Sequence, residues 1–208
     1  MHPNPAFRPD NHAESLALAR ETGFGMLAVA APDGAPMLSH IPFLIDDAGT
    51  GADLHLVRSN PIARACGADG LPARLAVQGP HSYISPDWYG LDDQVPTWNY
   101  LAIHLTGRLE PLPADTLPGI LDRLSAHFES RLAPKPEWTM AKMPSDAAQR
   151  MMRQILPFRL VIDTLESTWK LGQNKPDAAR LSAADHVGTY GMGQEVAILA
   201  AMMRAPPS

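Results

Sequence analysis

The sequence predicts a mainly β fold, a small closed antiparallel barrel with helices as decoration. Three observations lead to it: about six strand-like segments, short connections between most of them, and helical segments that do not alternate with strands as a parallel sheet requires. The 208 residues are 45% hydrophobic and 19% charged, with 21 prolines and 15 glycines that supply corners. This composition is globular, and we expect one domain over residues 1–208.

An extended arm with several prolines and one short helix are expected before the first strand. Asp10 or Asn11 can cap this helix, which runs to about Thr22, and Gly23 can stop it. The helix is expected to be an outer element of the fold.

Four strands are expected in the first part of the chain. The turn PDGA joins the first two, which is a hairpin signal. The third alternates between apolar and polar residues and ends at Asn60-Pro61, where proline suits the first turn of a helix that runs to about Cys66. The four segments cover residues 24–31, 36–45, 53–59 and 73–79.

The run GPHSYISPDWYGLDDQVPTWNYLAIHLTG, residues 79–107, is richer in polar aromatic side chains than a strand connection needs. An irregular aromatic segment is expected here, followed by a long fifth strand over residues 97–112. Tyr83, Trp88 and Trp98 each combine a large apolar face with a hydrogen-bonding group. Such side chains suit a planar ligand or a subunit interface.

The second half of the chain adds helices and the last strand. A helical excursion is expected over about residues 114–156, because apolar residues recur at helical spacing in 115–132 and again in 145–156. Residues 158–171 are expected to form the final strand. A helical tail over about residues 177–208 includes the apolar run QEVAILAAMMR.

Charge and cysteine content restrict the function classes. The formal net charge of −5 argues against a broad contact with nucleic acid, and neither a helix-turn-helix nor a basic stripe is apparent, so direct DNA binding is not supported by charge or motif. Cys66 is the only cysteine, which excludes an intramolecular disulfide and favours a reducing compartment. With no signal-peptide core and no membrane span, a cytoplasmic protein without membrane contact is expected.

Four histidines, His40, His55, His81 and His104, fall on or beside expected strands, where a cluster would be a candidate metal or haem site. No His-x-x-x-His or Cys-x-x-Cys spacing supports such a cluster, so no metal is expected, and hydrogen bonds within the barrel or to a ligand are the alternative. The sequence also lacks the G-x-S-x-G elbow, the phosphate loop and the dinucleotide fingerprint. A nucleotide-like ligand would have to be held in another way.

Two polar segments suit such a ligand. In VRSNP, residues 57–61, Arg58 supplies a guanidinium, while Ser59, Asn60 and the following helix supply hydrogen bonds suited to a phosphate. In STWKLGQNKPDAAR, residues 167–180, amide side chains can contact the donor and acceptor edge of a flavin, and lysine offers charge near its N1 and C2=O or near a phosphate. The alternatives are an ordinary strand-to-helix corner capped by Asn60 and a polar exit from the last strand.

Five motifs follow one another along the chain: LSHIPFLI (38–45), LHLVRSNP (54–61), VQGPHSYISPDWY (77–89), VPTWNYLAIHLTGRL (95–109) and WKLGQNKP (169–176). In this order and spacing they closely resemble the motifs of the PaiB-like FMN-binding family of negative transcriptional regulators. The resemblance implies an FMN-binding antiparallel split β-barrel, similar to pyridoxamine 5'-phosphate oxidases and flavin reductases. It also implies a homodimer with flavin at the subunit interface.

The same resemblance implies which residues bind FMN. One set would contact the ribityl phosphate and ring edge, a second would line the flavin from the facing side, and a third would form a closing segment. These sets are Ser39, His40, Arg58, Ser59 and Asn60; Thr97, Trp98 and Asn99; and Lys170, Gln173 and Asn174. The sequence departs from the family at Gly172, where serine is common, and so lacks one hydroxyl donor.

The function implied is that of a homodimeric FMN-binding regulator of the PaiB type. Two alternatives stay open: a flavin-dependent oxidoreductase of the pyridoxamine 5'-phosphate oxidase or flavin reductase class, and a haem-binding or haem-degrading split barrel. The sequence indicates no catalytic residue for either enzyme. Reduction of bound flavin by NADH or NADPH and its reoxidation by an added substrate would favour the oxidoreductase.

Overall fold

The computed structural model describes residues 1–8 and 12–206, so the helix cap expected at Asp10 or Asn11 lies outside the described residues. The chain divides into two compact units. The barrel unit comprises Ala19–Ala76 and Leu105–Thr164. The terminal unit comprises Met1–Leu18, Val77–His104 and Leu165–Ser208, and it contains both ends of the chain.

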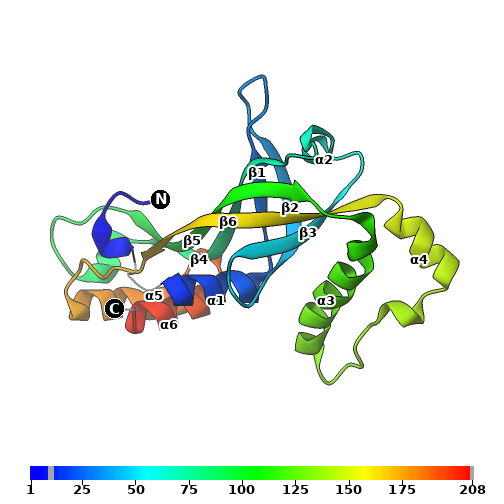
Figure 1. Ribbon diagram of the computed structural model, residues 1–208. Helices are drawn as coiled ribbons and strands as arrows, with labels where there is room; N and C mark the ends of the chain where they lie inside the picture. The colour runs from blue at the N-terminus through cyan, green and yellow to red at the C-terminus, as the bar shows by residue number, and fades with distance from the viewer. Residues whose placement is uncertain (9–11, 207–208) are drawn as a thin grey trace. The chain divides into compact units, whose positions relative to one another are not determined.

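Six strand segments form the barrel unit (Figure 1). They are β1 (Phe24–Val29), β2 (Met37–Ile45), β3 (Gly51–Val57) and the parts of β4 (Leu71–Ile84), β5 (Thr97–Pro111) and β6 (Ile155–Lys170) that fall within this unit. Their order is β1-β2-β3-β6-β5-β4. β1 also pairs with β4 in an antiparallel register, from Met26↔Ala76 to Val29↔Ala73, and this pairing closes the sheet. The closed antiparallel barrel predicted from the sequence is confirmed.

Alternating burial along the strands builds the interior of the barrel, because successive side chains of a strand point to opposite faces. The fully buried side chains of this unit include Phe43, Leu54, Leu75 and Phe158. Gly107 of β5 lies against the backbone of β6: a Cβ atom at this position would be 1.8 Å from the carbonyl oxygen of Val161. Glycine therefore allows the two backbones to approach closely at this point.

Three helices belong to the barrel unit, and a fourth, α1 (His12–Thr22), has residues in both units. α2 is Pro61–Ala65, and α3 (Leu117–Glu129) buries Leu117, Ile120 and Leu124, as its apolar spacing predicted. α4 (Ser145–Met152) is shorter than the helix predicted over 145–156. Ile155 instead begins β6, where it pairs with Val57. The last residues of the predicted helix therefore belong to a strand.

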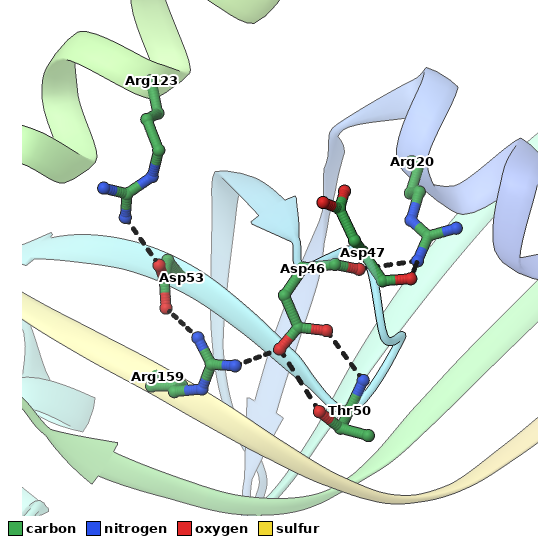
Figure 2. A network of polar contacts seen from close by, with 7 residues as sticks. All are labelled: Arg20, Asp46, Asp47, Thr50, Asp53, Arg123 and Arg159. Atoms are coloured by element: carbon green, nitrogen blue, oxygen red, sulfur yellow. Dashed lines mark hydrogen bonds and ion pairs between the residues drawn. The ribbon is translucent and has the colours of Figure 1, made fainter.

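Arg159 of β6 joins two acidic residues of the barrel unit (Figure 2). Its guanidinium donates to Asp53 Oδ1 at 2.7 Å and also pairs with Asp46 Oδ2. Arg123 of α3 donates to the other carboxylate oxygen of Asp53 at 2.8 Å, so the helix is bonded to the same network. The network links the β2–β3 connection, β6 and α3.

The β2–β3 connection is held by further bonds to Asp46. The backbone N–H of Thr50 donates to Asp46 Oδ1 at 2.9 Å, and Arg20 of α1 donates to the backbone oxygens of Asp46 and Asp47 at 2.6 and 2.8 Å (Figure 2). Burial by itself would raise the pKa of Asp46, but the bond from Thr50 and the charge of Arg159 outweigh it and hold that pKa below 3.8. Asp46 therefore acts as an ionised centre of this turn.

The terminal unit contains strand segments, the first part of α1 and two helices that lie side by side, α5 (Asp177–Tyr190) and α6 (Val196–Arg204) (Figure 1). Its sheet contains the remaining parts of β4, β5 and β6, and β7 (Gly193–Gln194), which pairs with β4. One apolar cluster joins sheet and helices, with Ile84, Leu101, Trp169, Val187, Leu199 and Met203 among its buried members. The described part of the predicted helical tail therefore contains two helices with β7 between them.

The segment after residue 79 differs from the prediction. β4 continues to Ile84, whereas an irregular segment was expected from Gly79 onward. Ser82 and Ile84 are buried, and His81 and Ser82 pair with β7, a strand that was not predicted. Among the described residues no helix has both the length and the apolar character needed to cross a membrane.

Candidate functional site

The barrel unit contains a fixed polar pair at the start of α2. Asn60 accepts a hydrogen bond from the backbone N–H of Ile62 at 2.9 Å and donates one to Ser39 Oγ at 3.0 Å. The first bond caps α2, which is the alternative considered for this corner, and Pro61 lies in the first turn of the helix as the sequence predicted. The second bond ties β2 to this corner. Both ends of the Asn60 amide are therefore used within the protein.

Arg58 lies two residues before this cap and is exposed. Its Nε donates to the backbone oxygen of Arg153 at 2.6 Å, and its backbone N–H donates to the oxygen of Gln154 at 2.9 Å. No carboxylate pairs with Arg58 in the part of the chain that the structure describes. Its positive charge is thus held near a neutral carbonyl and is not neutralised by an ion pair.

The other two predicted residues of this unit differ in their surroundings. Ser59 is exposed beside Arg58. His40 follows Ser39 on β2 and so points to the opposite face of the strand, where its ring stacks on Phe24 with centroids 6.4 Å apart. The structure brings Ser39 and Asn60 together and leaves His40 on the other face.

The terminal unit contains a pocket of about 300 Å³, and four predicted residues line it: Thr97, Asn99, Lys170 and Asn174. Thr97 and Asn99 share one face of β5 because they are two residues apart. Lys170 ends β6, and Asn174 belongs to the following turn. Strand periodicity and this turn thus place residues from separate motifs around one hollow.

Two ammonium groups reach this pocket. Lys170 Nζ donates to Thr97 Oγ1, and Lys175 Nζ donates to Gln94 Oε1, so each has a neutral partner. Neither lysine forms an ion pair with a carboxylate among residues 1–8 and 12–206. Burial, and then the charge of Lys175, lower the pKa of Lys170. The pocket therefore has a positive character that the protein does not balance by pairing.

Asn99 is 1% exposed, and its amide is only partly used. Its Nδ2 donates to the Sδ atom of Met203 at 3.6 Å, a weak interaction. Its Oδ1 is buried and accepts no hydrogen bond from any described residue. An unmet buried acceptor costs about 1–3 kcal/mol, so it calls for an explanation.

Gln173 and Trp98 do not line this pocket. Gln173 is bonded within its own turn, because Oε1 accepts from Leu171 N at 2.8 Å and Nε2 donates to the backbone oxygen of Trp169. Trp98 lies on the opposite face of β5 from Thr97 and Asn99, is 45% exposed, and contacts the ring of Tyr83 with centroids 6.2 Å apart. The structure thus separates these two from the other predicted residues of the terminal unit.

Several pocket residues were not predicted. Lys175 lies in the same motif as Asn174, and Tyr89 and Gln94 lie in the aromatic run, so their segments were recognised but the residues were not chosen. His2 and Phe7 of the N-terminal arm also line the pocket, and the backbone N–H of His2 donates to Thr168 Oγ1 at 3.0 Å. No spacing or motif in the arm indicates this role.

The four histidines are not gathered into a metal site. Within the described residues no group of three His, Cys, Asp or Glu side chains is placed to hold a metal ion. His55 is part-buried in the barrel unit, and burial lowers its pKa, which favours the neutral imidazole. His81 Nδ1 lies 3.2 Å from the backbone oxygen of Gly79.

Comparison with known proteins gives the chain its family. The model of the family described as "Putative FMN-binding domain" matches residues 1–164. The protease synthase and sporulation protein PAI 2 of Bacillus subtilis is 28% identical over 185 residues, which cover 87% of this chain and 86% of the relative. Lys170, Gln173 and Asn174 lie beyond the family match.

Two solved structures share the fold. A FAD and haem binding protein from Mycobacterium smegmatis superposes with a TM-score of 0.56 and 23% identity, over 87% of this chain and 80% of the other. A conserved hypothetical protein, Rv2991 from Mycobacterium tuberculosis, gives a TM-score of 0.59 and 14% identity, over 85% and 94%. At these identities the likeness concerns the fold alone. The family match, which covers more than half of the sequence, shows that the chain belongs to the FMN-binding domain family, as a PaiB-type split barrel with FMN as its cofactor.

Proposed function

We propose that the chain works as a cytoplasmic homodimer that holds FMN and acts as a negative regulator of transcription, with the flavin as sensor or prosthetic group. The family match and the Bacillus subtilis relative support this proposal. That relative is named for protease synthase and sporulation, and a regulatory role for this chain is in keeping with the name.

One observation carries the assignment of FMN to residues: Arg58 is a cation with no carboxylate partner among the described residues, and it lies beside the fixed pair of Ser39 and Asn60. A phosphate would supply the anionic partner for the Arg58 guanidinium. Hydrogen bonds between a guanidinium and a phosphate are charge-assisted and therefore strong. α2 is only five residues long, so its N-terminus by itself is not the reason for this assignment. We assign Ser39, Arg58 and Ser59 to the phosphate end of FMN, with Asn60 holding the corner that presents them.

The test compares FMN with riboflavin, which has the same ring and ribityl chain but no phosphate. We expect the wild-type protein to prefer FMN. Arg58→Ala should weaken the binding of FMN roughly 10- to 100-fold, which is the effect of losing one charged hydrogen bond, and should leave the affinity for riboflavin unchanged. Arg64→Ala is the matched control, because Arg64 is an exposed arginine of the adjacent helix.

Two results would contradict parts of this proposal. Equal FMN affinity in the Arg58→Ala and wild-type proteins would assign Arg58 to the surface. A colourless purified protein that also fails to bind added FMN would remove the flavin itself. Light scattering of the purified protein tests the homodimer separately.

The regulatory role is assigned to the flavin and not to a broad DNA contact, since the formal charge of the chain is −5. A gel shift on the upstream region of its own gene, at several salt concentrations, tests direct repression. A shift that appears at low salt and weakens as salt rises would show direct binding. Without it, regulation through flavin state or a protein partner is the mode that remains.

A flavin-dependent oxidoreductase is the second candidate, and one observation favours it. Lys170 and Lys175 bring positive charge, with no carboxylate partner among the described residues, to a pocket that also contains predicted flavin contacts. FMN supplies the redox chemistry when it is bound, and nearby cations favour the negative charge of a reduced flavin. Reduction of the flavin by NADH or NADPH, followed on its visible absorption, and reoxidation by an acceptor would support the enzyme.

A further inference from the structure

The barrel unit has an apolar pocket of about 290 Å³, and none of the predicted flavin contacts lines it. Five segments supply its walls: β3, α3, the connection between α3 and α4, α4, and the start of β6 with the residue before it. Its apolar side chains include Val57, Leu121, Trp138 and Ile155. The barrel unit thus presents a concave apolar surface that a small molecule can fill.

Four methionines line this pocket: Met140 and Met143 on the α3–α4 connection, and Met151 and Met152 on α4. Methionine side chains are flexible and polarizable, so a wall of this kind adapts to a ligand, and the sulfur makes favourable contacts with aromatic rings. Trp138 adds a flat indole ring, which prefers offset-stacked or edge contact with another ring. The chemistry of the walls therefore favours an aromatic ligand.

The polar groups of the pocket are few and neutral. Apart from the indole N–H of Trp138, they are the hydroxyl of Ser125 and the amide of Gln154, and none of the described residues that line the pocket carries a charge. A charged ligand would lose hydration there without gaining an ion pair, which costs free energy. The pocket therefore suits an uncharged ligand with one or two hydrogen-bonding groups.

The wall that carries Trp138 is tied to α3 by hydrogen bonds. The backbone N–H of Trp138 donates to Glu129 Oε2 at 2.8 Å, and the ammonium group of Lys135 pairs with the same oxygen. Lys142 Nζ donates to the backbone oxygen of Glu137 at 2.6 Å. Because the connection is already bonded, less conformational entropy is lost when a ligand binds against it.

The pocket is also joined to the corner that presents Arg58. Val57 lines the pocket and directly precedes Arg58, and the backbone oxygen of Gln154, another lining residue, accepts from the Arg58 N–H at 2.9 Å. The side chain of Arg58 is held by the neighbouring carbonyl, that of Arg153. A molecule in the pocket therefore contacts the segment that positions Arg58.

We propose that this pocket binds a small uncharged aromatic molecule, of the size of a phenol or an indole, and that its occupancy strengthens the binding of FMN through Arg58. The volume is at the small end of the range for ligand sites, and a hollow of this size is much smaller than the surface that two proteins bury in a stable interface. The ligand stabilises the arrangement in which two backbone carbonyls hold Arg58, so FMN, which uses Arg58, binds this arrangement more tightly. The site stands on the pocket alone, whereas its link to FMN rests on the proposed function.

The first experiment changes the ligand and leaves the protein intact, so it does not depend on whether a variant folds. Isothermal titration of the full chain compares 2-naphthol with 2-naphthoate, which adds a negative charge, and with 2-decalol, which has the same skeleton without aromatic rings. We expect 2-naphthol to bind at least about tenfold more tightly than 2-naphthoate and roughly 3- to 10-fold more tightly than 2-decalol. No binding of 2-naphthol, or equal binding of all three probes, would overturn the inference.

The second experiment places the probe in the pocket. Ala148 is buried in α4 and lines the pocket, so Ala148→Leu fills the hollow and should weaken 2-naphthol at least about tenfold. Ala147→Leu is the matched control, because Ala147 is the preceding residue of the same helix and does not line the pocket, and it should keep the wild-type affinity. Trp138→Leu keeps the wall apolar and should bring the preference for 2-naphthol over 2-decalol close to one.

Two results with these variants would contradict the site. Wild-type affinity of Ala148→Leu for 2-naphthol would mean that the probe binds elsewhere. A dimer that light scattering finds in the wild-type and Ala147→Leu proteins but not in Ala148→Leu would give the pocket to a second copy of the chain.

The third experiment measures the link to FMN. Saturating 2-naphthol should tighten FMN binding to the wild-type protein at least about fivefold and leave it unchanged in Ala148→Leu, and by reciprocity FMN should tighten 2-naphthol by the same factor. A 2-naphthol site without effect on FMN would overturn the link. Binding of 2-naphthol by a protein that does not bind FMN would overturn the proposed function alone, whereas FMN binding that depends on Arg58 in a protein that binds no 2-naphthol would overturn this inference alone.

Discussion

Asn60 in the barrel unit and Asn99 in the terminal unit are both predicted ligand contacts, but their amides are used differently. Asn60 is bonded at both ends, to Ile62 and to Ser39. Asn99 is more deeply buried and has a single weak bond, to the sulfur of Met203. Asn99, whose burial makes a missing hydrogen bond more costly, is therefore the residue whose amide is not fully hydrogen-bonded.

This difference separates a structural role from a binding role. A buried polar group without a partner lowers stability, so such a group persists where something outside the fold uses it. Asn60 builds the corner at which Arg58 is presented, and the structure explains it without a ligand. Asn99 has a buried acceptor that no described residue uses, and a ligand explains it more simply than the fold does.

The largest expected effect concerns backbone packing in the two units. Gly107→Ala in the barrel unit would place a Cβ atom 1.8 Å from Val161 O, so β5 and β6 would have to separate. We expect a loss of about 3 kcal/mol or more in the free energy of unfolding, measured by urea denaturation.

Gly188→Ala in the terminal unit is the matched control for that variant. Gly188 lies inside α5, and the nearest atoms to its added Cβ would be 3.8 Å away, which is ordinary contact. Because alanine favours a helix interior over glycine, we expect a gain of up to about 1 kcal/mol. Equal losses at both positions would show that the terminal unit is packed as tightly as the barrel.

The next effect tests the ionic network of the barrel unit. Arg159→Met would leave Asp46 and one oxygen of Asp53 without their cation, and we expect a loss of about 1–2 kcal/mol in unfolding free energy. Arg123→Met removes only an outer, 58% exposed partner of Asp53 and should change stability by less than about 0.5 kcal/mol. If both variants change the free energy of unfolding by less than about 0.5 kcal/mol, the network contributes no more to stability than exposed ion pairs do.

The charge of Asp46 also predicts a pH dependence of stability. The pKa of Asp46 in the folded protein lies below its ordinary value of 3.8, so the carboxylate contributes stability above pH 3.8 and loses that contribution as pH falls through the lower, folded pKa. The advantage of the wild-type protein over Asp46→Asn should therefore shrink on acidification below about pH 4. Thermal unfolding of both proteins across this range measures it, and an advantage independent of pH would contradict an ionic role.

The barrel could be predicted from the sequence because its signals are local. Strand alternation, the PDGA turn and the Asn60-Pro61 corner each depend on a few consecutive residues, and the starts of β1 to β5 all lie close to prediction. The end of α4 and the extension of β4 to Ile84 could not be predicted in this way. Both depend on partners distant in sequence, Val57 for Ile155 and β7 for His81.

The candidate site could be predicted in part. The resemblance implies Thr97, Asn99, Lys170 and Asn174 as FMN contacts, and the structure places all four around one pocket. That Asn99 lines the pocket and Trp98 does not could have been predicted, because the side chains of adjacent strand residues point to opposite faces. The roles of His2 and Phe7 could not, since contact between the arm and β6 leaves no pattern in either segment.

The most direct test of the comparison is a change of sign between the two asparagines, and the smallest expected effect is that of Asn99. Asn60→Ala removes a helix cap and the bond to Ser39, and it should lower the free energy of unfolding of the ligand-free protein by about 1–2 kcal/mol. Asn99→Leu replaces an unmet acceptor by an apolar group of similar size next to Met203, so it should be neutral or stabilising by up to about 1 kcal/mol. Urea denaturation of both variants without ligand measures these changes. A loss of more than 1 kcal/mol in Asn99→Leu would mean that its amide already serves the fold, and the contrast between the two residues would no longer point to a ligand.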